Sequence, residues 1–490
     1  MKYRVSILLA GFALVGLLWQ AACGADELES ARQALRKAGR YWASHVASHG
    51  GYVWEYSTDF TTRRRGESGN LPLSTDWVQP PGTPTVGMAF VKAYEATGES
   101  IYLDAAVAAA RCLVFGQLES GGWSYSIEFD SKRNRNRYHH LDPKTTLNYS
   151  KLHNTTTFDD DTTQSATRFL MALDRYVDDP EIGATLHRAL ECFLRAQYRT
   201  GLWDGAWPQR YPPPKGYGAY PTFNDNTMSD CVRTMLIAAH QYKDPRYLAS
   251  VKRCLEFYLR SQLPSPQAAW AQQYDKHLKP AWARKFEPPA VTGGESAGNM
   301  RLLMDMYIEF GDPRYLEAVG QAADWYRRAR IGGTENHGIW ARFYELGTNR
   351  PLYFTRTYKL VYSDDDLPVH YSFQGNWGVD AILQRYDALK KRGRNYYLKQ
   401  RARQKTAAQW AALARSVAPK VRKIIETQDE LGRWVHVVAK REQLRDKQGR
   451  VSYQTDPSIK LAMMYSNEFC QNMRALATYI TAAQGGPVKQ

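Results

Sequence analysis

Beyond its first 25 residues, the sequence has no apolar stretch long enough to span a bilayer. Cysteine is also scarce. Apart from Cys23, there are five cysteines, which are scattered, odd in number and without the spacing of metal ligands. Each lies in an apolar helical pattern, so we expect buried structural thiols with no part in catalysis. Acidic residues are short as well, with 49 Asp and Glu against 65 Lys and Arg.

The first 25 residues have the pattern of a secretory signal peptide. Lys2 and Arg4 precede an apolar run over Ile7–Trp19, which is followed by the small residues AACGA. We therefore predict a signal peptide over residues 1–25, cleaved after Ala25, and a secreted or periplasmic protein. Lipid anchoring through Cys23 is the alternative.

The formal net charge of +16 indicates a polyanionic partner. We do not expect a nucleic-acid partner, because no nucleic-acid-binding motif is present and the chain is predicted to be exported. An acidic polysaccharide fits, since sugar faces stack on aromatic rings and uronate carboxylates pair with Arg and Lys. We expect a monomer that binds such a polysaccharide.

A repeat runs through the chain. Each copy holds two amphipathic segments of helical period, split by a turn built on Asp-Pro or Gly-Glu-Ser. The prolines of these turns, Pro180, Pro245 and Pro313, are 65 and then 68 residues apart. A loop with a tryptophan follows each second helix. The copies span residues 90–117, 169–197, 235–262 and 302–330.

Helical hairpins repeated at this spacing predict an all-α fold, an α/α toroid, with long tryptophan-bearing loops lining a cleft at one end. The toroid would be an incomplete barrel, and an open solenoid is the alternative. We assign residues 26–390 to the toroid domain and residues 391–490 to a helical C-terminal region that extends or completes it. The added helices are expected near residues 30–49, 410–428 and 460–482. Strands are expected only as short pieces in the loops.

Two polar clusters occupy the same slot in successive repeats. Asp159, Asp160 and Asp161 stand just before one first helix, and Asn224, Asp225 and Asn226 stand before the next. Aspartates there can simply cap the helix. Three adjacent acids exceed what a cap needs, however, and oxygen-only ligands favour a hard cation such as Ca²⁺.

Arginines mark two further segments. The stretch WARFYELGTNRPLYFTR carries Arg342, Arg350 and Arg356 with a single acid, Glu345, which suggests that the missing anion arrives with a ligand. In EPPAVTGGESAGNMR, Glu295 begins a first helix and Arg301 lies about two turns into it.

Several motifs, DGAWPQRYP, TFNDNTM, WAQQYD, PAWAR, GGESAG and WARFYELGTNRPLYFTR, resemble the calcium-dependent pectate lyases of polysaccharide lyase family ten. They stand in the family's order and cover residues 74–386. The resemblance implies a toroid of paired helices and cleavage of polygalacturonate by β-elimination, which gives 4,5-unsaturated oligogalacturonides.

The resemblance also implies roles for individual residues. Asp159 and Asp225 match the metal ligands, and Arg301 looks like the base that takes the C5 proton. Arg342 and Arg356 look like the arginines that hold substrate carboxylates. We add three residues to the substrate-binding set: Arg350, Trp207 and Asp160. The chain departs from the family in DDDTT, where Asp-Asn-Gly-Ala-Thr is usual, and in FTRT, where GRDG is usual.

The chemistry is physically consistent, because the C5 proton becomes removable when Ca²⁺ and arginines neutralise the neighbouring carboxylate. A guanidinium has a pKa above about 12, so an arginine base requires a positive cleft and predicts an alkaline optimum. Two alternatives stay open. One is a glycoside hydrolase on the same fold, and the other is a polyuronate-binding protein without catalytic activity.

Overall fold

The computed structural model describes residues 26–65, 70–445 and 451–488. The predicted signal peptide, residues 1–25, and the alternative lipid anchor at Cys23 lie outside these residues. Within the described ranges, no helix combines the length and the apolar character that crossing a membrane requires.

Helical hairpins form the units that the sequence predicts. In three of them the second helix begins at the proline of Asp-Pro, and the preceding aspartate (Asp179, Asp244 or Asp312) accepts hydrogen bonds from the first helical N–H groups. The four hairpins are α2 (Thr83–Thr97) with α3 (Ser100–Gly116), α4 (Thr162–Leu173) with α5 (Pro180–Ala196), α6 (Thr227–Tyr242) with α7 (Pro245–Ser261), and α8 (Gly293–Phe310) with α9 (Pro313–Ala329).

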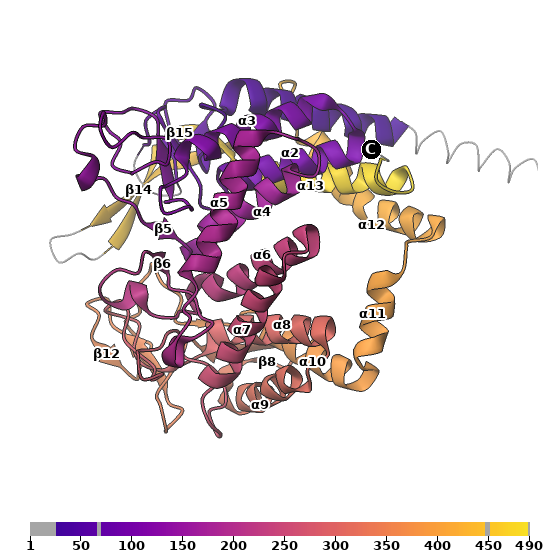
Figure 1. Ribbon diagram of the computed structural model, residues 1–490. Coiled ribbons are helices and arrows are strands. Elements are labelled where there is room, and N and C mark those ends of the chain that lie inside the picture. Colours follow the sequence, from indigo (N-terminus) through magenta and orange to yellow (C-terminus); the bar gives the residue numbers. More distant parts are fainter. Residues whose placement is uncertain (1–25, 66–69, 446–450, 489–490) are drawn as a thin grey trace, which may run out of the picture.

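The hairpins stand side by side in an arc of two layers (Figure 1). The first helices α2, α4, α6 and α8 contact one another in that order, and the second helices α3, α5, α7 and α9 do likewise. The chain continues through α10 (Val379–Arg392) and α11 (Arg394–Ala402), and α11 links the arc to α12 (Ala407–Glu426). The predicted α/α toroid, an incomplete barrel, is confirmed.

Short antiparallel strands organise the loops at one end of the hairpins. β5 and β7 matter most for the site, because each leads directly into the start of a first helix. The loop strands are β1 (Glu55–Ser57), β2 (Arg63–Arg64), β3 (Thr75–Trp77), β4 (Ser126–Glu128), β5 (Thr156–Thr157), β6 (Arg210–Tyr211), β7 (Val291–Thr292), β8 (Gly332–Thr334), β9 (His337–Ala341), β10 (Phe343–Tyr344), β11 (Pro351–Phe354), β12 (Leu360–Val361) and β13 (Gln374–Gly375).

The C-terminal region contains a long hairpin that the sequence analysis missed. β14 (His436–Arg445) pairs with β15 (Val451–Tyr465), which also pairs with β1. The expectation of strands only in short loop pieces is therefore wrong here, and the helix expected near residues 460–482 begins at Ser466 as α13 (Ser466–Ala483). α13 packs on α2 and α12. The division between residues 26–390 and 391–490 stays a prediction.

The loop tryptophans are buried anchors. Each points its indole N–H at a carbonyl near the end of the preceding helix, at 2.8 or 2.9 Å. Trp207, predicted to bind substrate, is 0% exposed, so it cannot stack on a sugar and that prediction is wrong. The pairs are Trp123 with Leu113, Trp207 with Phe193, Trp270 with Tyr258, Trp340 with Tyr326 and Trp434 with Ile424.

A glutamine after several second helices joins neighbouring units. Its Nε2 donates to a carbonyl of its own loop and to a carbonyl in the next helix of the same layer. Gln428, after α12, repeats this device and reaches Ala34 in the helix over residues 26–41 at 2.9 Å. The C-terminal and N-terminal helices are therefore joined as successive units. The other members are Gln117, Gln197 and Gln262 with Thr185, Ser250 and Ala318 of the next helix.

Candidate functional site

Two short helical turns carry the polar clusters. η3 (Asp159–Asp161) runs into α4, and η6 (Asn224–Asn226) runs into α6. The second and third residues of both turns have positive φ, 52° and 58° in η3 and 48° and 60° in η6. Aspartate and asparagine tolerate this conformation better than other residues with side chains. The predicted equivalence of the two slots is thus present in the backbone.

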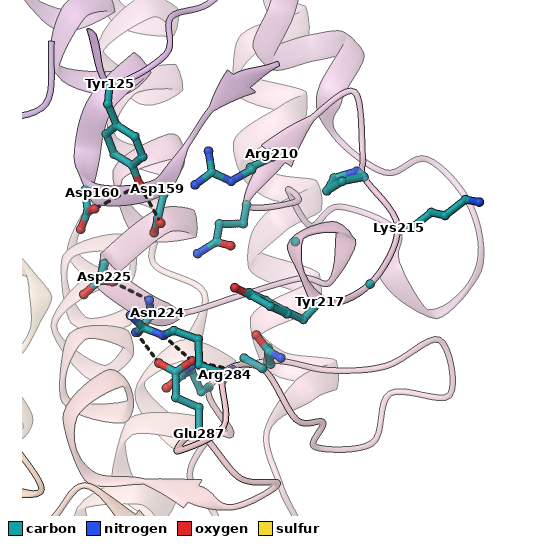
Figure 2. Close-up of a pocket in the computed structure, with 17 residues that line it drawn as sticks. Tyr125, Asp159, Asp160, Arg210, Lys215, Tyr217, Asn224, Asp225, Arg284 and Glu287 are labelled. Carbon is teal, nitrogen blue, oxygen red and sulfur yellow. Dashed lines mark hydrogen bonds and ion pairs between the residues drawn. The ribbon is translucent and has the colours of Figure 1, made fainter. Parts of the chain in front are cut away.

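Three carboxylates of these turns form one cluster. Asp159, Asp160 and Asp225 each offer an oxygen, and the three oxygens lie within 4.8 Å of one another. The Tyr125 hydroxyl lies 2.9 Å from Asp159 Oδ2 and 3.2 Å from Asp160 Oδ2 (Figure 2). Asp160, which the sequence analysis placed with the substrate-binding residues, therefore stands beside the two predicted metal ligands.

The carboxylates of the cluster repel one another when they are charged. Desolvation and the charge of Asp159 raise the pKa of Asp160 to about 6. Desolvation and the charges of Asp160 and Asp159 raise the pKa of Asp225 to about 7. In addition, the buried Asp159 Oδ1 accepts no hydrogen bond from the described residues. A hard divalent cation would neutralise this repulsion and use the free oxygen, so the donor set fits Ca²⁺.

Asp161, the third acid of the DDD run, does not join the cluster. Its two carboxylate oxygens lie 2.7 and 2.5 Å from Arg168 Nη2, on α4. The same arginine donates from Nη1 to Thr234 on α6 at 3.0 Å. The extra acid is thus neutralised within the protein and adds no ligand to the cation site.

A cavity of about 570 Å³ opens beside the acid cluster. Figure 2 shows Arg210 and Arg284 beside the three acids, with Lys215 at the far side. Arg284 forms an ion pair with Glu287, 2.8 Å from Nε to Oε2. Burial lowers the pKa of Arg284, but the bonds and charge of Glu287 outweigh it, and the net pKa is raised.

Tyr125, Arg210 and Arg284 are not among the site residues predicted from the sequence. The signal for them was present, because Arg210 and Arg284 lie in the motifs DGAWPQRYP and PAWAR, and Tyr125 lies in the tryptophan-bearing loop that follows residues 90–117. All three line the cavity of the acid cluster.

A second, smaller cavity of about 230 Å³ adjoins the first. Asp225 lines both cavities, so they share a wall. Arg301, Arg342 and Glu295 line the second one, together with Trp377. Burial lowers the pKa of Arg301, whose Nη2 donates to the Trp377 carbonyl.

Arg342 has an acid partner, contrary to the expectation that its segment lacks one. Its Nη2 donates to Glu295 Oε1 at 2.7 Å, and its guanidinium lies 4.3 Å from the centre of the Tyr371 ring. The partner was missed because it lies 47 residues earlier in the chain. Burial lowers the pKa of Arg342, but the charges of Glu295, Tyr371 and Asp225 outweigh burial, and the net pKa is raised. Arg342 Nε remains buried without a hydrogen bond among the described residues.

Arg350 and Arg356 lie apart from these two cavities. The Arg350 guanidinium stacks 3.6 Å from the centre of the Tyr362 ring. Arg356 is exposed and pairs with Asp366 at 3.3 Å, so it too has an acid partner. Neither residue lines the cavity of the acid cluster or the one that contains Arg342. Their predicted contact with substrate stays a prediction.

The five cysteines in the described ranges are all free and buried. Burial raises the pKa of each thiol, which keeps them protonated and unreactive. Their expected structural role agrees with this placement.

A comparison with known protein families gives a match that spans this site. The family model described as pectic acid lyase matches residues 117–382. The chain belongs to this family. The matched residues include all three cluster acids and both lined cavities. Family membership supports a polysaccharide lyase.

Solved structures give looser likenesses. A family 10 polysaccharide lyase from Cellvibrio cellulosa, solved as a mutant in complex with trigalacturonic acid, is 21% identical, with a TM-score of 0.46 over 63% of this chain and 97% of that chain. A family 76 α-mannanase from Bacteroides thetaiotaomicron is 8% identical, with a TM-score of 0.43 over 94% of this chain and 95% of that chain. No curated protein matches the sequence.

Proposed function

We propose that this member of the pectic acid lyase family cleaves polygalacturonate by Ca²⁺-assisted β-elimination and releases 4,5-unsaturated oligogalacturonides. One observation carries the proposal: Asp225 belongs to the acid cluster and also lines the cavity that contains Arg342. A cation site and a guanidinium therefore face the same short stretch of a bound chain. That is the arrangement needed to neutralise a uronate carboxylate from two sides.

The residues have separable tasks. Asp159, Asp160 and Asp225 would hold the cation, which supplies positive charge to the carboxylate next to the C5 proton. Arg342 is held by Glu295 and Tyr371 before substrate arrives, so it needs little reorganisation to receive a carboxylate.

Two arginines are candidates for the base that removes the C5 proton. The sequence predicts Arg301, and burial lowers its pKa as a base requires. The structure adds Arg284, which shares the cavity of the acid cluster, whereas Arg301 lines the adjoining one. The base must reach the sugar whose carboxylate is neutralised, and this position in the cavity favours Arg284, although its ion pair with Glu287 raises its pKa and would have to break before it could act as a base. We further propose secretion, through the predicted signal peptide, and action as a monomer.

The decisive test is an assay on polygalacturonate by ultraviolet absorbance of the unsaturated product. We expect activity in added Ca²⁺, loss of activity with a chelator and recovery when Ca²⁺ is returned in excess. New reducing ends without unsaturated product would instead indicate a glycoside hydrolase. Binding without any cleavage would indicate a non-catalytic polyuronate-binding protein. Either result would refute the proposal.

A further inference from the structure

Three arginines occupy one position in successive repeats. Arg168, Arg233 and Arg301 are 65 and then 68 residues apart, the same spacing as the prolines that begin the second helices. They lie on α4, α6 and α8, and Arg168 and Arg233 each stand seven residues beyond the last residue of the preceding turn, η3 or η6. Such regularity indicates a role in the architecture of the repeat, because a single reaction needs one base.

Each of these arginines contacts the repeat unit that follows it in the arc. Arg168 donates to Thr234 on α6 at 3.0 Å. Arg233 lies 3.9 Å from Asp305 on α8. Arg301 donates to the carbonyl of Trp377, just before α10. The three side chains thus form a ladder that ties each first helix to its successor.

At the last of the three arginines, Arg301, the guanidinium lies against the turn at Gly378. A Cβ atom on Gly378 would come within 2.6 Å of Arg301 Nη2, and Gly378 has a φ of +73°. A residue with a side chain would therefore strain the backbone and displace the guanidinium. Glycine at position 378 is what lets Arg301 reach the Trp377 carbonyl.

This turn is connected to Arg342 through hydrogen-bonded strands. Trp377 closely follows β13, in which Gln374 pairs with Ala341 and Gly375 with Trp340. The backbone N–H of Arg342 donates to the Phe373 carbonyl at 2.7 Å. Holding the 373–378 segment in place therefore also holds the backbone that carries Arg342.

We propose that Arg301 is a positioning residue, which fixes the 373–378 segment and through it places Arg342 for the substrate carboxylate. It neither takes the C5 proton nor needs to touch the reacting sugar. The inference rests on the proposed function and replaces the catalytic role predicted for Arg301 from the sequence. It leaves Arg284 as the arginine for proton abstraction in the cavity of the acid cluster.

The test is a double-mutant cycle between Arg301 and Arg342, made in the full chain and measured with polygalacturonate in Ca²⁺. Arg301→Ala should raise KM about tenfold, as expected for a lost hydrogen bond to a charged group. It should also lower kcat, by about three- to tenfold, because a displaced Arg342 neutralises the carboxylate less well in the transition state, and it should leave the shape of the pH profile unchanged. Arg301→Lys should recover part of the loss, because an ammonium group can still donate to the Trp377 carbonyl. In an Arg342→Ala background, Arg301→Ala should then raise KM by less than about threefold, since the effects are coupled.

A base behaves differently in each readout. A collapse of kcat with unchanged KM, no recovery by lysine and a loss of the alkaline limb of the pH profile would overturn the proposal. Additive effects of Arg301→Ala and Arg342→Ala on KM would overturn it too. Circular dichroism of each variant checks the fold, and the lysine variant keeps the test informative if the alanine variant unfolds. Failure of the wild type to cleave polygalacturonate would refute the proposed function instead, and that assay comes first.

Discussion

Replacing Asp225 by asparagine should move the stability of the metal-free and the Ca²⁺-bound protein in opposite directions. The metal-free protein holds Asp159, Asp160 and Asp225 within 4.8 Å of one another, and they repel when charged. An asparagine side chain cannot ionise, so the variant is relieved of that repulsion but loses a cation ligand. We expect the variant to be more stable than the wild type in chelator and less stable in Ca²⁺.

The magnitude follows from the pKa of Asp225, which is raised from 3.8 to about 7. A raised pKa means that the folded state binds this proton more tightly than the unfolded chain does. Stability is therefore lost as pH rises from about 4 through about 7, and the full cost applies above that range. Three units correspond to about 4 kcal/mol, and solvent screening of this exposed side chain reduces the figure to about 1–2 kcal/mol.

Thermal unfolding at pH 8, with chelator and with excess Ca²⁺, measures both effects. The wild type should gain about 2–3 kcal/mol from Ca²⁺ at a hundredfold excess over Kd, and Asp225→Asn should gain almost nothing. Asp161→Asn is the matched control, because Asp161 lies in the same acid run but pairs with Arg168. It should keep the Ca²⁺ response. An undiminished response in Asp225→Asn would refute the assignment of the cation site.

Three further predictions follow from the described contacts. Ca²⁺ affinity, measured by titration calorimetry, should rise between pH 5 and pH 8, because Asp160 and Asp225 have pKa values of about 6 and about 7 and must lose protons to bind; a flat profile would contradict this. Trp207→Phe should lower the free energy of unfolding by about 1 kcal/mol, since the Phe193 carbonyl loses one of its two donors, and leave KM unchanged; a raised KM would restore Trp207 as a sugar-binding residue. Thiol-blocking reagents should leave turnover of the folded enzyme unchanged, and inactivation without unfolding would count against buried, structural cysteines.

The repeat was predictable because short-range sequence patterns specify it. Asp-Pro both ends a turn and begins a helix, so the positions of Pro180, Pro245 and Pro313 predicted the second helices directly. The pairing of the β14–β15 hairpin with β1 was not predictable in this way. β15 pairs with β1, where Tyr465 lies opposite Glu55, and no local pattern records a partner so distant in the chain.

The site was predictable in its acids and less so in its arginines. Asp159 and Asp225 were found because equivalent slots of a repeat must meet at one end of the toroid. The same regularity misled the interpretation of the arginines, since a periodic position such as that of Arg301 indicates architecture as readily as chemistry. Aromatic residues misled in another way. A tryptophan in a loop can face solvent or fold back onto a helix, and only the carbonyl that each indole meets distinguishes the two.

The hydrogen bond from Gln428 to Ala34 joins residues 394 positions apart, so it can form only late in synthesis of the chain. The helix over residues 26–41 is among the first described parts to be synthesised, yet α12 and α13, on which it depends, are among the last. During translation that helix keeps an uncovered apolar face, and its contacts with the C-terminal helices cannot form until those final helices emerge. Contacts of such long range also make folding slow. For the secretion proposed above, such late formation of the contact would favour translocation before folding.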